Sequence, residues 1–265
     1  MIQLNCSQCG IQILVPPTVQ GREGICFGCG APLQVPVSKE HDQVDLTFAE
    51  GTRISGRYLL HEKIGQGGMG VVHRAEDTLV KEMVALKFMK PQLLKTQQGQ
   101  LGFIREAQIA RRLRHENIVA VHDLSWTNEG VLYITMEFLS GPSLRAMLRR
   151  HRQERRLIDV RLAISIINQI LGALEYAHRT VIHRDIKPEN IMLLPGEHVK
   201  VLDFGLAKAV DEQVKESSGS GAEKRISGTW AYASPEQKKH WPVDFRSDIY
   251  SVGLVLYELL TLRTP

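Results

Sequence analysis

Two motifs give the strongest indication of the fold: His183-Arg184-Asp185-Ile186-Lys187-Pro188-Glu189-Asn190 and, after it, Asp203-Phe204-Gly205. Taken alone, Asp185 or Asp203 could each be an ordinary turn residue. That explanation becomes very improbable when both motifs occur in this order. They indicate a functional site, whose other parts have to be sought along the rest of the chain.

A glycine-rich segment lies upstream, Gly65-Gln66-Gly67-Gly68-Met69-Gly70. The same spacing of glycines occurs in dinucleotide-binding folds, where it opens a helix. Here the following residues, 71–77, have a β-rich composition and lead to another expected strand, Met83–Phe88. A loop between two strands predicts a flap that covers phosphate groups, because glycines let backbone N–H groups approach closely.

Further motifs follow in order: Val84-Ala85-Leu86-Lys87, an expected helix over about 97–114 that contains Glu106, an expected strand pair ending at 133–139, Gly228-Thr229, Ala233-Ser234-Pro235-Glu236, and 248–253. With the first motifs, they resemble the protein kinase family over about residues 53–265. Lys187 and Thr229 match the serine/threonine branch of the family, and the segment 228–237 is most similar to that of bacterial Ser/Thr kinases. The resemblance implies a bilobal α+β fold, with a five-strand sheet and one helix above a mostly helical lobe.

The same resemblance implies transfer of the ATP γ-phosphate to Ser/Thr hydroxyls of proteins. Lys87 would hold the α- and β-phosphates, kept in place by an ion pair with Glu106. Asp185 would orient the acceptor hydroxyl and accept its proton. Lys187 would neutralise charge on the γ-phosphate. Asn190 would bind one Mg²⁺ ion, and the aspartate of the Asp-Phe-Gly motif would bind another.

The residues that the resemblance places around ATP are Ile64, Gly65, Gln66, Gly67, Gly68, Met69, Gly70, Val72, Ala85, Lys87, Met136, Glu137, Leu139, Met192 and Asp203. Val72 and Ala85 would cover the adenine from above, and Met192 from below. Backbone groups of Glu137 and Leu139 would meet its edge, and the methionine before them would be the gatekeeper.

Regulation by phosphorylation is a hypothesis that starts from Arg184. In the family, an arginine at this position receives a phosphate from the activation segment, here 203–236. That segment contains five candidate hydroxyls: Ser217, Ser218, Ser220, Ser227 and Thr229. A phosphate there would add about −1.5 to −2 charge for Arg184 to pair with. We therefore expect autophosphorylation, and self-association of the chain if it occurs in trans.

All four cysteines lie near the N-terminus, in the pattern Cys6-x2-Cys9-x16-Cys26-x2-Cys29. Four thiolates at this spacing predict a tetrahedral zinc site that is structural, because no ligand position stays open. The segment resembles a zinc ribbon with strands at 11–15 and 32–35. Two disulfides, four idle thiols and an iron–sulfur site are the alternatives. Nucleic-acid binding is not expected, because the module offers almost no basic side chains.

Composition excludes several other classes of protein. The chain has 265 residues, 43% of them hydrophobic and 23% charged, with a net charge of +4. These values are ordinary for a globular protein and exclude a disordered or collagenous chain. No apolar run reaches the roughly 18–20 residues that a membrane-spanning helix needs, and no secretory signal is present. We expect a cytoplasmic location, where cysteines stay reduced.

The expected organisation is a zinc ribbon over 1–36, a linker over 37–52 and a kinase domain over 53–265. The kinase domain looks incomplete at its C-terminus, because the last helices of the lower lobe are missing. The helix expected at 249–260 is apolar on nearly every face, so we expect it to expose apolar surface. A rival function is a non-catalytic scaffold whose ribbon recruits a partner, and a lesser one is kinase activity on small molecules.

Overall fold

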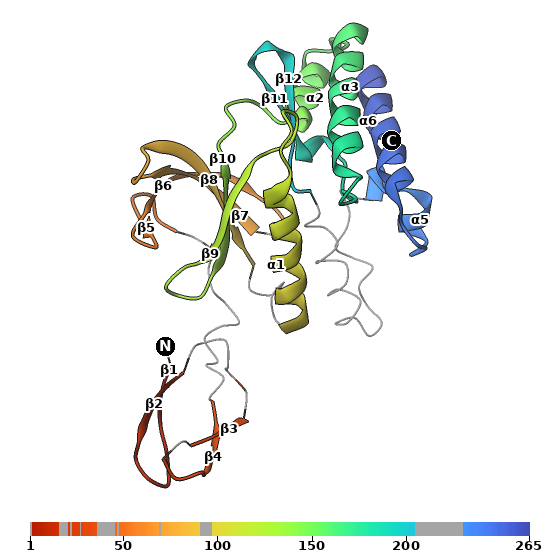
Figure 1. The fold of residues 1–265 in the computed structure, drawn as a ribbon. Coiled ribbons are helices and arrows are strands. Elements are labelled where there is room, and N and C mark those ends of the chain that lie inside the picture. The colour runs from red at the N-terminus through yellow and green to blue at the C-terminus, as the bar shows by residue number, and fades with distance from the viewer. Residues whose placement is uncertain are drawn as a thin grey trace.

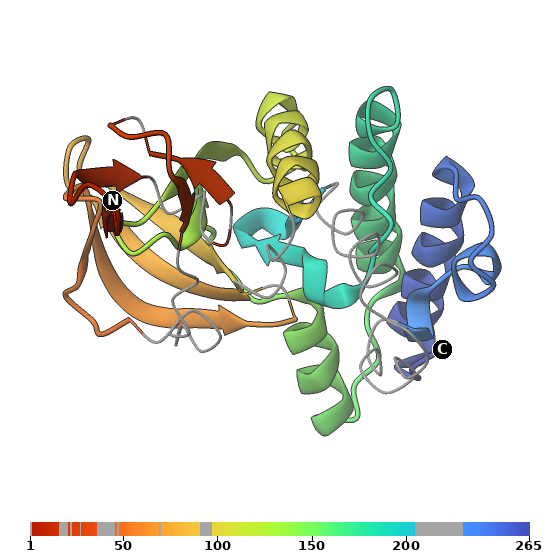
Figure 2. The ribbon, with the colours of Figure 1, turned by 90° about the horizontal axis from the view of Figure 1, so that it is seen from below.

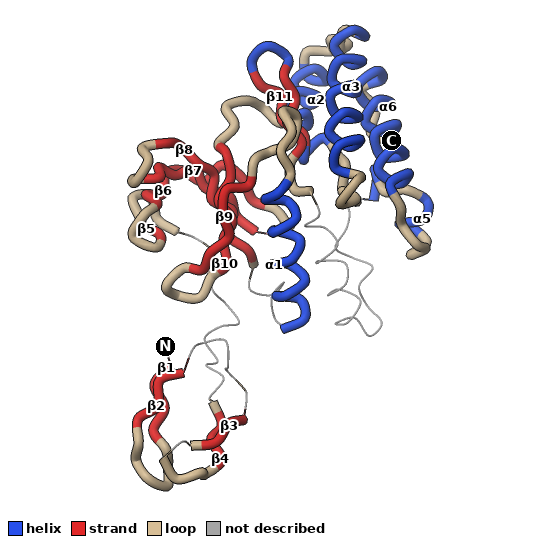
Figure 3. The backbone as a smooth tube through the Cα atoms, in the orientation of Figure 1, coloured by secondary structure: helices blue, strands red, loops and turns tan. Residues whose placement is uncertain are grey.

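The computed structural model describes residues 2–15, 21, 23–26, 28–35, 46, 48–68, 70–90, 97–204 and 230–265. The chain forms a small N-terminal β unit, a larger β-sheet and a helical part (Figure 1). Strands dominate the first two parts and helices the third (Figure 3). Among the described residues, no helix is both long enough and apolar enough to cross a lipid bilayer.

The N-terminal unit consists of two short antiparallel hairpins. Strand β1 (Ile2–Asn5) pairs with β2 (Gln12–Val15), and β3 (Glu23–Ile25) pairs with β4 (Pro32–Gln34). Its buried cluster contains Leu4, Cys6, Ile13, Cys26, Ala31 and Val35, all from this unit. The unit therefore has a small core of its own.

The larger sheet has six strands in the order β5-β6-β7-β8-β10-β9, and every neighbouring pair is antiparallel. The strands are β5 (Arg53–Ile54), β6 (Tyr58–Gln66), β7 (Gly70–Asp77), β8 (Glu82–Met89), β9 (Val121–Trp126) and β10 (Leu132–Glu137). The expectation of five strands was wrong by one. The extra strand, β5, has only two residues, which is too short to give a periodic pattern in the sequence.

Helix α1 (Gln97–Arg112) covers one face of this sheet, on the side toward the helical part (Figures 1 and 2). Its residues Phe103 and Ala107 share a buried cluster with Ala85 and Met136 of the sheet. This packing places α1 against β8, the strand that carries both Ala85 and Lys87.

The opposite face of the sheet is covered partly by residues that the sequence assigns to the linker. Leu46 is buried in the cluster of that face, and Phe48 packs against it. The Phe48 ring lies 4.3 Å from the ring of Phe88, measured between centroids. The backbone of Gly51 then donates to the carbonyl of Leu60 at 2.8 Å. Leu46, Phe48 and Gly51 therefore pack with the six-stranded sheet, although the sequence assigns them to the linker.

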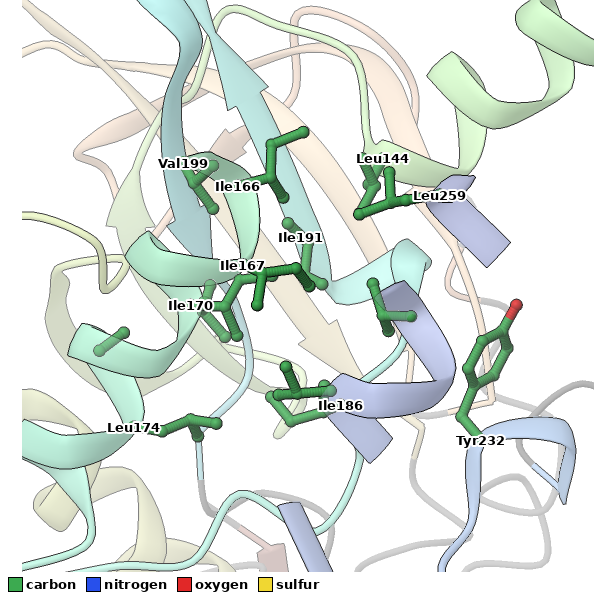
Figure 4. Close-up of a cluster of buried hydrophobic side chains, with 14 of the residues drawn as sticks. Leu144, Ile166, Ile167, Ile170, Leu174, Ile186, Ile191, Val199, Tyr232 and Leu259 are labelled. Carbon is green, nitrogen blue, oxygen red and sulfur yellow. The ribbon is translucent and has the colours of Figure 1, made fainter. Parts of the chain in front are cut away.

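The helical part contains α2 (Leu144–Gln153), α3 (Val160–Ala177), α5 (Pro235–Lys238) and α6 (Phe245–Thr261), with a hairpin of β11 (Ile191–Leu194) and β12 (His198–Val201). Asp159 caps α3 by accepting from the backbone N–H of Arg161 at 2.7 Å. The apolar core between these elements includes Leu144, Ile166, Ile167, Ile170, Leu174, Ile186, Ile191, Val199, Tyr232 and Leu259 (Figure 4).

Helix α6 buries one side and leaves apolar side chains on the other. Val255 and Leu259 are fully buried, whereas Ile249, Tyr257 and Leu260 are each at least 40% exposed. This agrees with the expectation that the helix exposes apolar side chains.

Candidate active site

The backbone of the motif 183–190 is held by one buried carboxylate. Asp248, in the first turn of α6, accepts from the backbone N–H groups of His183 and Arg184, both at 2.8 Å. The same carboxylate contacts His178 Nε2 at 2.8 Å. Arg184 has a φ of 67°, in the left-handed region that costs free energy for a residue with a side chain. The two bonds from Asp248 hold the loop in this conformation.

Asp185 lies at the centre of a polar group. Its Oδ2 atom contacts Lys187 Nζ at 2.7 Å and accepts from Asn190 Nδ2 at 3.0 Å. Asn190 also donates to the backbone carbonyl of Asp185 at 2.8 Å. The other oxygen, Oδ1, is buried and has no hydrogen-bond partner among the described residues. A buried carboxylate oxygen without a donor is unfavourable, so Asp185 is ready to accept a hydrogen bond from an incoming hydroxyl.

Lys87 of β8 reaches the Asp-Phe-Gly motif. Its Nζ atom lies 2.7 Å from Asp203 Oδ2, and both side chains are largely buried. Burial by itself raises the pKa of the Asp203 carboxyl, but the charge and hydrogen bond of Lys87 outweigh this effect. The pKa of Asp203 therefore lies below its ordinary value, and the group is an anion that can bind a cation.

Two contacts place Asp203 beside the motif 183–190. The backbone N–H of Leu202 donates to the carbonyl of Asn190 at 2.8 Å. His183 accepts from the backbone N–H of Asp185 at Nδ1, so its Nε2 proton is available for the carbonyl of Leu202 at 2.7 Å. Asp185, Asn190 and Asp203 are thereby brought together from two segments of the chain.

The residues expected around the adenine gather on the sheet. Val72, Ala85, Met136 and Leu139 belong to one apolar cluster, and Met136 pairs in register with Ala85. Met192 lies on β11 in the helical part and forms a bridge with a residue just before α2. Val72 and Ala85 therefore lie on the sheet lobe and Met192 on the helical lobe, and their contact with ATP stays a prediction.

Glu137, at the end of β10, is tied to both lobes. Its carboxylate accepts from the backbone N–H of Ala120 at 2.6 Å and from Lys200 Nζ of β12 at 2.7 Å. Its own N–H donates to the carbonyl of Ala120 at 3.0 Å. These contacts fix the strand end whose backbone is expected to meet the adenine.

The glycine loop is the turn between β6 and β7. The backbone N–H of Gly67 donates to the carbonyl of Gly70 at 2.9 Å, and Ile64 is half exposed. Gly65 and Gln66 close β6, opposite Val72 and Val71 of β7. The loop therefore has the strand–turn–strand form that the sequence predicts.

Several expected features fall outside the described residues. They are Met69, Gly205, the five activation-segment hydroxyls at 217–229, and the side chain of Glu106, although α1 itself is described. The ion pair between Lys87 and Glu106 therefore stays a prediction.

Asp248, His183 and Phe204 carry no role predicted from the sequence, although the structure gives all three positioning contacts. The His183 ring packs edge-on against Phe204 at 4.6 Å. The motif at 248–253 was the available signal for Asp248. Its bonds to a loop more than 60 residues away in sequence leave no local pattern.

The four cysteine sulfurs lie within 4.8 Å of one another. The Sγ atoms of Cys6 and Cys29 are 3.6 Å apart, as are those of Cys9 and Cys26. A tetrahedral zinc with bonds of about 2.3 Å would separate its sulfurs by roughly 3.8 Å, which fits this cluster. Bonded disulfide sulfurs would lie about 2.05 Å apart.

Backbone hydrogen bonds and neighbouring thiols both act on the acidity of these cysteines. Hydrogen bonds from the backbone N–H groups of Cys9 and Gln8 lower the pKa of Cys6 to about 6. A backbone hydrogen bond from Ala31 also favours the Cys29 thiolate, but the neighbouring thiols, led by Cys9, raise the pKa of Cys29 to about 12. A cation at the centre would remove this repulsion and stabilise all four thiolates.

Comparison with known proteins agrees with this geometry. The protein kinase domain family matches residues 58–265. A probable serine/threonine-protein kinase of Streptomyces coelicolor is 43% identical over 220 residues, which are 82% of this chain and 32% of that protein. The kinase PknB of Mycolicibacterium smegmatis is 42% identical over 216 residues, covering 80% of this chain and 33% of its own length. The chain thus spans about a third of the length of these relatives.

Solved structures give the same result for the fold. The crystal structure of the PknI kinase domain of Mycobacterium tuberculosis has a TM-score of 0.64 and 27% identity, covering 83% of this chain and 79% of that domain. The bilobal fold expected from the motifs is confirmed. With the family match over residues 58–265, the sheet lobe, the helical lobe and the polar cluster between them establish that this chain belongs to the protein kinase family.

Proposed function

We propose that the chain is a protein serine/threonine kinase that transfers the γ-phosphate of ATP to protein hydroxyls. The observation that carries this proposal is the buried Oδ1 of Asp185, which has no donor among the described residues, with Lys187 and Asn190 on the other oxygen. The relatives that match most of this chain are named serine/threonine kinases, and Lys187 supports the same specificity.

The proposed roles follow from the contacts. Lys87 exchanges its contact with Asp203 for phosphate oxygens and holds the triphosphate. Asp203 and Asn190 supply the oxygen ligands that Mg²⁺ prefers. When bound, Mg²⁺ supplies charge neutralisation on the phosphates. Asp185 accepts a hydrogen bond from the substrate hydroxyl and takes up its proton, while Lys187 neutralises charge on the transferred group.

Replacing Asp185 by asparagine tests this proposal. Asp185→Asn keeps the size of the side chain but removes the proton acceptor, so we expect transfer of labelled phosphate to a protein substrate to fall on the order of 100-fold or more. Asp123→Asn, on the exposed part of β9, is the matched control and should keep its activity. Equal transfer by the wild type and Asp185→Asn would favour the non-catalytic scaffold instead.

We also propose that Cys6, Cys9, Cys26 and Cys29 hold one structural zinc ion. The spacing of the four sulfurs supports this, and so does the small size of the core around them. A unit of about 35 residues rarely folds without a metal or disulfides. A reducing compartment such as the cytoplasm suits four thiolate ligands.

Phosphorylation of the activation segment also remains a proposal. Arg184 lies at the position that would pair with such a phosphate, and self-association would be needed if transfer occurs between two copies.

A further inference from the structure

The helical lobe contains a completely buried carboxylate outside the catalytic cluster. Glu258 of α6 is 0% exposed. It accepts from Arg145 Nη1 at 2.6 Å, from Arg152 Nη2, and from the hydroxyl of Tyr232. An unpaired carboxylate in such a position would be very costly, so the three donors compensate its burial.

Arg145, in the first turn of α2, uses all three of its nitrogens in different directions. Nη1 donates to Glu258, Nη2 donates to the Tyr232 hydroxyl, and Nε donates to Glu189 at 2.8 Å. Glu189 lies inside the catalytic motif, next to Asn190, which holds Asp185. One side chain therefore joins α2, α6, the catalytic motif and the segment that contains Tyr232.

Tyr232 belongs to the segment 230–238, which has a second link to the catalytic motif. Gln237 Nε2 donates to the carbonyl of Arg184 at 2.7 Å. The backbone carbonyl of Tyr232 accepts from Ser251 of α6 at 2.8 Å. The segment is thus attached to the catalytic motif near both of its ends, once directly and once through Arg145.

Arg152 makes a useful comparison, because it shares only part of these contacts. It donates to Glu258, to the backbone carbonyl of Leu262 and to Thr264. All of these partners belong to α6 or the residues after it, and no contact of Arg152 with Glu189 or Tyr232 occurs among the described residues. Arg145 and Arg152 therefore both compensate Glu258, but only Arg145 reaches the catalytic motif.

We propose that Arg145 is a positioning residue, which holds the catalytic motif and the segment around Tyr232 in the relative position needed to phosphorylate a protein substrate. This inference rests on the proposed kinase function. The three-way contact requires the planar guanidinium group, since a lysine has a single nitrogen and cannot span three partners in these directions. Phosphoryl transfer depends mainly on positioning, so a small displacement of either segment reduces turnover.

The test compares Arg145→Lys with Arg152→Lys in the full 265-residue chain, using labelled ATP and a peptide substrate. Both variants keep a positive charge beside Glu258. We expect Arg145→Lys to lower kcat for peptide phosphorylation on the order of 10- to 100-fold, while the Kd for Mg²⁺–ATP stays unchanged. Arg152→Lys should keep the kinetics of the wild type, even if its melting temperature falls.

Glu189→Gln extends the test to a side chain that is 44% exposed, so the variant is expected to fold. It weakens the contact with Arg145 and, like Arg145→Lys, should lower kcat. Adding it to Arg145→Lys should cost less than the product of the two single effects, because both act through one contact.

Three results separate the possible explanations. If the wild type transfers no phosphate, the proposed kinase function fails. If the wild type is active and Arg145→Lys and Arg152→Lys lose turnover equally, the arginines only balance the charge of Glu258 and the inference is overturned. Full turnover of both Arg145→Lys and Glu189→Gln would overturn it as well.

Discussion

Gly70 illustrates how a single position can be restricted by a neighbouring strand. A Cβ atom built on Gly70 would lie 1.9 Å from the backbone carbonyl oxygen of Phe88. Because that atom belongs to the backbone of β8, it cannot turn aside as a flexible side chain would. Gly68, two residues earlier in the same loop, has no atom within 4 Å of such a Cβ.

Gly70→Ala should therefore destabilise the sheet, whereas Gly68→Ala should not. We expect the free energy of unfolding to fall by about 1–3 kcal/mol for Gly70→Ala, because β7 and β8 have to separate. Denaturant unfolding of both variants measures the difference. Equal stabilities would show that β8 can shift without cost.

The membership of a residue in the polar cluster could be predicted where a motif contains it, and not where it depends on distant contacts. Lys87, Asp185 and Asp203 were identified from their motifs, and the structure brings their side chains into one region. Arg145 gave no such signal, because its partners lie 44 to 113 positions away in the sequence. Such contacts are set by how helices pack, which no local pattern reports.

At the scale of elements, one ion pair joins the end of β7 to the turn before β6. Asp77 accepts from Arg57 at Nε and Nη2, and its side chain is only 5% exposed. The hydrogen bonds from Arg57 lower the pKa of Asp77 below its ordinary value, despite the opposing effect of burial. The ionised form of Asp77 is therefore more favourable in the folded state than in the unfolded chain.

The sign of the resulting pH dependence follows from linkage. A carboxyl with a lowered pKa stabilises the fold above its ordinary value of 3.8, and this contribution is lost as pH falls through the folded-state pKa. Asp77→Asn should thus be less stable than the wild type at pH 7, and the difference should shrink below about pH 4. Glu62→Gln, which removes an exposed pair with Arg74, should have little effect at either pH.

The longer elements were predictable because their patterns are strong. The helix expected at 97–114 extends over Gln97–Arg112, and the strand expected at Met83–Phe88 extends over Glu82–Met89. The packing of Leu46 and Phe48 was not predictable in this way. Two apolar side chains in a polar stretch form no helical or strand periodicity. Their burial depends on contacts with a face of the sheet that lies elsewhere in the sequence.

At the scale of the whole molecule, the N-terminal unit and the two lobes have separate cores. The buried cluster of the unit contains only residues between Leu4 and Val35, and the clusters of the two lobes contain none of them. Folding of the unit should therefore depend on its metal, while folding of the lobes should not.

Removal of the metal tests this independence. A chelator should release about one zinc ion per chain, as expected for a site with four cysteine ligands. Amide protection from hydrogen exchange should then be lost in β1, β2, β3 and β4 and kept in β8 and α3. Cys26→Ser should give the same pattern without the chelator. A wild-type chain that contains far less than one zinc ion would contradict the proposed site, and loss of protection in β8 would contradict independent folding.

The contact of Phe48 with Phe88 also has a mechanical consequence. Phe88 follows Lys87 on β8, so Phe48 contacts the strand that carries this lysine. A pull on the chain at Leu46 or Phe48 would therefore act directly on this face of the sheet. A minimal catalytic fragment that begins at residue 53 would lose this anchor, and one that begins before residue 46 would keep it.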